Sequence, residues 1–112
     1  MKKFKDHDYS HRLTEATRII EKYPDRVPII VETSENIKLD RHKYLVPRDL
    51  SCGQFLFVLR KRMKLEPSKA VFMFINKEIP PTAEIINHIY EKYKDKDKFL
   101  YIFITEENTF GF

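Results

Sequence analysis

FLYIFI, at residues 99 to 104, is the stretch of sequence that decides the fold. It is apolar without alternation, so a strand built from it needs cover on both of its faces. One layer of helices covers only one face of a sheet. We therefore expect helices on both faces of the sheet, the second layer being supplied by the N-terminal helices.

The segments before this strand alternate between helix and strand patterns. KDKDK, at residues 94 to 98, predicts a solvated turn. The turn follows a predicted helix, which Thr82 caps and which carries apolar residues from Ile85 to Tyr93. A strand is predicted before that helix, at residues 71 to 75. Another helix, capped by Asp49 or Ser51, buries one face from Cys52 to Met63 and stops before Pro67.

The first part of the chain predicts an outer helix and a hairpin. Residues 27 to 31 and 42 to 47 indicate two strands, and their short link favours antiparallel pairing. The helix before them is capped by Ser10 and ends at Pro24, with Ile19 beside its apolar stripe. The stripe comprises Leu13, Ala16, Ile20 and Tyr23, and Phe4 and Tyr9 are candidate anchors in the charged stretch before it.

This order of elements indicates an α+β fold in one compact domain. Within it we expect an N-terminal helical subdomain at residues 1–23, a core at residues 24–104 and a flexible C-terminal tail at residues 105–112.

Composition excludes several classes of function. The formal net charge of +4 comes from 21 cations and 17 anions, and because acidic residues interrupt the basic segments we expect no nucleic-acid partner. Two glycines are too few for a phosphate-binding or dinucleotide-binding loop. A single cysteine fits a reducing compartment, and neither a secretory signal nor a membrane-spanning stretch is visible.

Two pairs of reactive residues are interpreted as structural. His7 and His11 have the i, i+4 spacing of a metal pair, but no third ligand follows at a standard spacing, so we expect no metal and no cofactor. Cys52 with His88 suggests a nucleophile and its base, but Cys52 lies on an apolar stripe and no third group orients the pair. We expect a buried thiol and a protein that is not an enzyme.

Five longer motifs resemble one family. They are YPDRVPIIVE, KYLVPRDL, GQFLFVLRKRM, FINKEIPPT and FLYIFITEENTFGF. These stretches are similar to the ubiquitin-like autophagy modifiers, the family of GABARAP and microtubule-associated light chain 3, with the closer likeness to the GABARAP branch. The likeness covers nearly the whole chain. It departs between Glu32 and Lys43, where a turn is shorter than in GABARAP, and at Cys52, where serine or threonine is typical.

The resemblance implies a ubiquitin-like β-grasp core preceded by two helices, and a chain that is conjugated through its tail. A cysteine protease would cleave between Gly111 and Phe112, and activating-like and conjugating-like enzymes would carry the Gly111 carboxylate as thioesters to phosphatidylethanolamine. Glycine has no Cβ, so its carbonyl is the least hindered for such transfer. The implied location is the cytoplasm and, after lipidation, the autophagosomal membrane or the membrane of another organelle.

The resemblance also implies binding of aromatic-x-x-aliphatic motifs carried by cargo receptors and adaptors. A first pocket would use Glu15, Ile19, Pro28, Lys43, Leu45 and Phe99. A second would use Tyr44, Val46, Pro47, Leu50, Phe55, Val58 and Leu59. Acidic residues that flank the motif would contact Arg26, Lys43, Arg62 and Lys64.

Strand addition gives this binding a mechanism. If residues 43 to 47 form an edge strand, an extended peptide pairs with them and buries two apolar anchors, each stabilised by about 1.5–3 kcal/mol. For Leu50 and Phe55 the alternative is ordinary core, and for Lys43 and Arg62 it is a solvated charge. The alternative function is a non-covalent adaptor in vesicle traffic or on microtubules. In either case we expect a monomer in solution.

Overall fold

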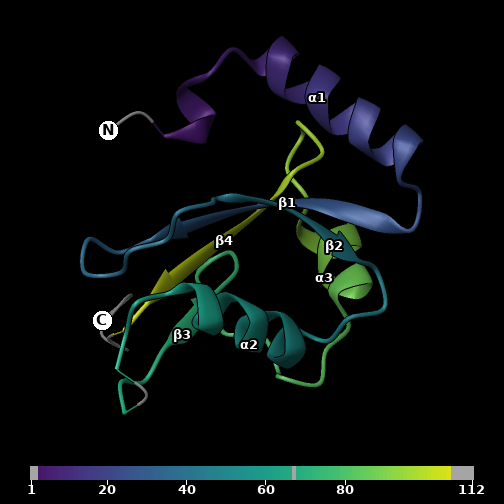
Figure 1. Ribbon diagram of the computed structural model, residues 1–112. Coiled ribbons are helices and arrows are strands. Elements are labelled where there is room, and N and C mark those ends of the chain that lie inside the picture. The colour runs from purple at the N-terminus through teal and green to yellow at the C-terminus, as the bar shows by residue number, and fades with distance from the viewer. Residues whose placement is uncertain (1–2, 67, 107–112) are drawn as a thin grey trace.

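A computed structural model describes residues 3–66 and 68–106 of the chain (Figure 1). The described residues form a 3-10 turn, η1, three helices and four strands. They are η1 (Phe4–Asp6), α1 (Tyr9–Lys22), β1 (Arg26–Thr33), β2 (Lys43–Pro47), α2 (Cys52–Arg62), β3 (Phe72–Phe74), α3 (Ile86–Tyr93) and β4 (Leu100–Thr105).

The four strands form one mixed sheet in the order β2-β1-β4-β3. β1 and β4 are parallel neighbours in the centre, while β2 and β3 pair antiparallel with them at the two edges. Along β4 the side chains of Leu100, Ile102 and Ile104 are fully buried, and those of Tyr101 and Phe103 are partly buried. β4 is therefore a central strand, and the cover predicted for both of its faces is present.

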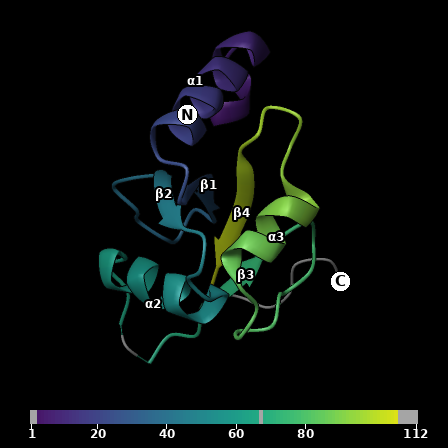
Figure 2. The same cartoon turned by 90° about the vertical axis from the view of Figure 1, so that its right-hand side faces the viewer.

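Helices cover both faces of this sheet, as the lack of alternation in β4 requires. Figures 1 and 2 show α1 above the sheet and both α2 and α3 below it. The larger core cluster lies on the α2 and α3 side and includes Phe55, Leu59 and Tyr90. A smaller cluster on the α1 side is built on Ala16, Ile30 and Phe99, with Phe4, Ile19 and Tyr101 packed against it.

The N-terminus of α2 is fixed by its own sequence. The Ser51 hydroxyl accepts a hydrogen bond from the Gln54 amide at 3.1 Å, and the Gln54 side chain accepts one from the Ser51 amide at 2.9 Å. This reciprocal pair satisfies two amides that the first turn leaves unpaired. A Cβ on Gly53 would lie 3.2 Å from the Thr82 carbonyl oxygen, so the close contact of α2 with that loop favours glycine.

The predicted starts of two helices need correction. The first helix begins at Tyr9 with Asp8 at its N-cap, and Ser10 bonds the Asp8 carboxylate rather than capping. The third helix begins at Ile86, not at Thr82. The Thr82 carbonyl instead accepts a hydrogen bond from the Gly53 amide, and Ile85 forms an isolated β-bridge with Ser51.

The apolar stripe of α1 is also displaced from the predicted one. Tyr23 is exposed, whereas Ile19 packs against the smaller core cluster beside the fully buried Ala16. α1 therefore faces the sheet with Ala16 and Ile19.

Candidate peptide-docking site

β2 lies at an edge of the sheet, and among the described residues it has a neighbouring strand on one side only. The Val31 amide bonds the His42 carbonyl at 2.7 Å, which makes these two residues a hydrogen-bonded pair. Antiparallel pairs alternate, so the register places Ile29 and Tyr44 in the next such pair. The amide and carbonyl of Lys43 and Leu45 therefore point away from β1, toward solvent.

A hollow of about 490 Å³ lies beside this edge, on the α1 face of the sheet. It is lined by Phe4, Ile19, Ile30, Arg41, His42, Lys43 and Leu45. Three of the residues assigned to the first pocket by resemblance, Ile19, Lys43 and Leu45, are thus brought together. An apolar hollow next to an open strand edge suits an extended peptide that buries one large side chain.

The other three assigned residues lie deeper or at the rim. Phe99 is fully buried with Ala16 and Ile30, and the Phe4 ring contacts the Phe99 ring edge-on with centroids 4.8 Å apart. Pro28 is buried in β1. Glu15 forms an ion pair with Lys43 across the mouth of the hollow, between α1 and β2.

The second assigned pocket is a cluster on the opposite face of β2, against α2. The rings of Tyr44 and Phe55 meet edge-on with centroids 5.7 Å apart. Val46, Phe55 and Leu59 are core residues, whereas Tyr44, Pro47 and Leu50 are partly buried and Val58 is 44% exposed. The accessible part of this cluster is therefore its rim, and the core alternative holds for Phe55.

Tyr44 has an unusual environment. Its hydroxyl is buried and makes no hydrogen bond with any described residue. Burial raises the pKa of the Tyr44 phenol, and the nearby Arg62 charge opposes that rise. The Arg62 guanidinium lies over the Tyr44 ring, 5.9 Å from its centre, at a distance that allows a cation–π contact.

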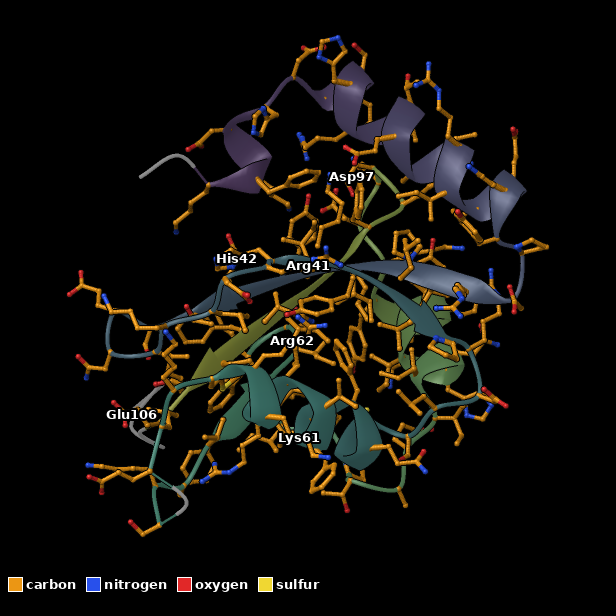
Figure 3. All side chains as sticks on the ribbon, in the orientation of Figure 1. Arg41, His42, Lys61, Arg62, Asp97 and Glu106 are labelled. Carbon is orange, nitrogen blue, oxygen red and sulfur yellow. The ribbon has the colours of Figure 1, made fainter. Side chains whose placement is uncertain are left out.

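The predicted acidic-flank cations do not form one group. The Arg26 guanidinium donates to the outward-facing Leu45 carbonyl at 3.3 Å and so lies on the strand edge itself. Arg62 and Lys64 line a separate hollow with the β1–β2 loop, which includes Lys38 and His42. Figure 3 shows Arg41 and His42 along the hairpin, near the sheet, and Arg62 on α2.

Four lining residues were not predicted for the first pocket. Ile30 and Phe4 come from β1 and η1, and Arg41 and His42 come from the loop before β2. Alternation along VPIIV could have indicated Ile30, because it shares a face with Pro28. The loop residues carried no comparable signal.

Cys52 and His88 lie in different surroundings. Burial raises the pKa of the Cys52 thiol to about 11, which keeps it protonated, and His88 instead bonds Glu84 at 3.0 Å. Within residues 3–66 and 68–106 no group of three His, Cys, Asp or Glu side chains is arranged to hold a metal ion. In the same residues no helix is both long and apolar enough to cross a bilayer. Gly111 and Phe112 lie outside the described residues.

The mixed sheet with helices on both faces and an open edge at β2 defines a ubiquitin-like α+β protein. Among solved structures, ATG8 of Trypanosoma brucei superposes with a TM-score of 0.86 at 42% identity, covering 94% of this chain and 93% of that one. Plasmodium falciparum Atg8, solved in complex with a P. falciparum Atg3 peptide, gives a TM-score of 0.85 at 31% identity, covering 96% and 98%.

Sequence comparison identifies the family. Residues 11–111 match the model of the Atg8 ubiquitin-like autophagy proteins. Autophagy-related protein 8d of Arabidopsis thaliana is 54% identical over 109 residues, which span 95% of this chain and 91% of the relative. Autophagy-related protein 8 of Aspergillus niger is 53% identical over 113 residues, which span 97% and 96%. The chain belongs to the Atg8 family.

Proposed function

We propose that the chain is a ubiquitin-like modifier, cleaved after Gly111, conjugated to phosphatidylethanolamine on autophagic membranes, and used there as a scaffold for aromatic-x-x-aliphatic motifs. The observation that carries the docking role is the outward-facing backbone of Lys43 and Leu45 beside an apolar hollow. An extended segment that pairs with β2 would place its aromatic side chain over Ile19 and Leu45. Its aliphatic side chain would reach the rim at Val58 on the other face.

The binding is expected to be moderate in strength. Two anchors stabilise the complex by about 1.5–3 kcal/mol each, and backbone pairing adds to this before ordering costs are subtracted. Micromolar dissociation constants, about 8 kcal/mol, fit that balance. The Atg3 peptide bound by the Plasmodium relative supports conjugating-like enzymes as one class of partner.

Conjugation is supported by the family match, which extends through residue 111. Incubation of the full chain with a processing protease of the family, followed by intact-mass measurement, tests the first step. We expect loss of Phe112 alone, leaving a carboxylate on Gly111. An unchanged mass under conditions that cleave a known Atg8 precursor would contradict this step.

One variant, Gly111→Ala, distinguishes covalent conjugation from a non-covalent adaptor role. With the family's activating and conjugating enzymes, ATP and vesicles containing phosphatidylethanolamine, the chain ending at Gly111 should become membrane-bound. Gly111→Ala should remain in solution while still binding a motif peptide. Equal recruitment of both forms would favour the non-covalent adaptor.

A further inference from the structure

The turn before β4 holds a buried carboxylate that its sequence does not suggest. KDKDK was predicted to be solvated, yet Asp97 is fully buried. The Lys98 amide bonds the Asp95 carbonyl at 2.9 Å, and Lys98 adopts a positive φ of 71°. This tight turn allows one Asp97 oxygen to accept the Phe99 amide at 2.8 Å.

The second oxygen of Asp97 joins the turn to the N-terminal helix. Arg12 of α1 donates to it at 2.6 Å, with only 12% of the arginine side chain exposed, and the Tyr101 hydroxyl of β4 donates to it as well. The Arg12 Nε also donates to the His7 carbonyl at 3.1 Å, and His7 is the residue that ends η1. In Figure 3 Asp97 lies between α1 and the sheet.

The other polar contacts between this turn and the N-terminal segment are more exposed. Lys5 pairs with Asp95 at 2.8 Å with half of the lysine side chain exposed, and the Tyr9 hydroxyl bonds the Lys96 carbonyl at 3.1 Å. Exposed pairs of this kind contribute little, whereas removal of one partner from a buried pair leaves an uncompensated charge. The Arg12–Asp97–Tyr101 cluster is therefore more buried than these contacts, and also more buried than the Glu15–Lys43 pair, which joins α1 to β2 with 39% and 41% of the two side chains exposed.

The Arg12–Asp97–Tyr101 cluster affects the first pocket because the walls of that pocket come from both the N-terminal layer and the sheet. Phe4 and Ile19 belong to η1 and α1, while Ile30 and Leu45 belong to the sheet. Phe99, whose amide is fixed by Asp97, supports the pocket from below and contacts Phe4. The width of the hollow therefore depends on how closely α1 and η1 are held against the sheet.

We propose that Asp97 is a positioning residue that sets the first pocket for an aromatic side chain of the docked peptide, through its contacts with Arg12 and Tyr101. The inference rests on the proposed docking function. It assigns the selectivity for an aromatic anchor to a buried cluster that the peptide does not touch.

The test uses the full chain and three synthetic peptides. One carries an aromatic-x-x-aliphatic motif, the second replaces its aromatic residue with alanine, and the third replaces its aliphatic residue with alanine. Titration calorimetry gives two affinity ratios, one for each anchor. In Asp97→Asn the amide directs N–H groups at Arg12, so the aromatic ratio should fall by about tenfold, the scale of coupling within one side-chain network. The aliphatic ratio should stay unchanged, which a general loss of stability would not produce.

Glu91→Gln is the matched control. It also neutralises a carboxylate beside an arginine, 3.8 Å from Arg48, but on α3. It should preserve both ratios. Because Asp97→Asn could fail to fold, Tyr101→Phe serves as a milder variant that removes one donor and keeps the ion pair. Circular dichroism checks the fold of each variant, and Tyr101→Phe should lower the aromatic ratio by about threefold.

The outcomes distinguish a failure of the Asp97 inference from a failure of the proposed docking function. If the native chain shows no aromatic preference, the docking function fails and the inference fails with it. If the native chain prefers the aromatic peptide while folded Asp97→Asn and Tyr101→Phe keep the native ratio, only the inference is overturned. If Asp97→Asn does not fold, the Tyr101→Phe ratio decides.

Discussion

Burial decides the chemistry of the one cysteine. Cys52 lies in the main core with Phe55 and Leu59, and its charged form is disfavoured there. Desolvation, with a smaller contribution from Glu84, raises the pKa of the thiol from 9.0 to about 11. A thiol in this state is a poor nucleophile.

This shift predicts an alkaline loss of stability. Between about pH 9 and pH 11 the unfolded thiol is ionised while the folded thiol stays protonated. The unfolded state then binds fewer protons, so the free energy of unfolding falls as pH rises, by at most about 1.4 kcal/mol per pH unit. Urea unfolding at a series of pH values measures the slope. Cys52→Ala should lose less stability between pH 9 and 10 than the native chain; equal slopes would contradict the assignment.

The limits of sequence interpretation are clearest at single residues. Asp95 and Asp97 alternate with lysines in KDKDK, and no periodicity distinguishes them. Their different fates depend on Arg12, which lies far away in the sequence and meets Asp97 only after folding. The same holds for Arg41 and His42, whose place beside the hollow follows from a loop conformation. Ile19 was placed in the pocket through family resemblance.

At the scale of elements, β2 provides the backbone geometry of the proposed docking site. Its residues alternate in the direction of their backbone groups, so Leu45 presents its amide outward while Tyr44 belongs to a hydrogen-bonded pair with Ile29. Proline is tolerated in an edge strand where the missing amide would face solvent. This alternation allows a substitution that affects peptide pairing more than the sheet.

Leu45→Pro should therefore weaken peptide binding beyond the effect of Leu45→Ala. The additional loss corresponds to one backbone hydrogen bond, about 2–10-fold in the dissociation constant. Fluorescence anisotropy with a labelled motif peptide measures both variants. Tyr44→Pro is the comparison, since it removes an amide that faces β1 and should lower the melting temperature much more than Leu45→Pro. Equal affinities of Leu45→Pro and Leu45→Ala would argue against strand addition.

α1 is expected to open more easily than the sheet beneath it. Its buried contacts with the sheet centre on Ala16, Ile30 and Phe99, whereas α2 and α3 share the much larger core cluster. Regions with few buried apolar contacts open at lower free energy. Amide hydrogen exchange should show residues 9–22 exchanging at least about a hundredfold faster than the protected amides of β1 and β4. Equal protection in the two regions would place α1 in the main cooperative unit.

The elements themselves were largely predictable because their signals are local. Apolar runs indicated all four strands, and Ser51 with Gln54 forms a capping box that fixes the start of α2. Helix starts without such a pair were misplaced, as at Ser10 and Thr82. The cover on both faces of β4 followed from its lack of alternation. The open edge at β2, by contrast, depends on the strand order, which the sequence left open and only the structure gives.

At the scale of the whole molecule, several cations lie near the edge proposed for docking. The net charge is +4, and Arg41 and Lys43 line the first hollow. The hollow at the hairpin is lined by the cations Lys38, Arg62 and Lys64 and by the anions Glu35 and Asp40. Such a distribution speeds the approach of an acidic segment and is weakened by salt, because the charges are largely exposed.

Peptide binding should therefore depend on salt only when the motif is flanked by acidic residues. Raising the ionic strength from low salt to about 0.5 M should weaken an acid-flanked peptide several-fold and leave a neutral-flanked one nearly unchanged. Arg62→Gln should reduce this difference, because Arg62 lies over Tyr44 at the second pocket. Lys92→Gln also removes one exposed positive charge, but from α3, and it should leave this difference unchanged. If both variants reduce the salt dependence alike, the net charge and not the placement of Arg62 governs the encounter.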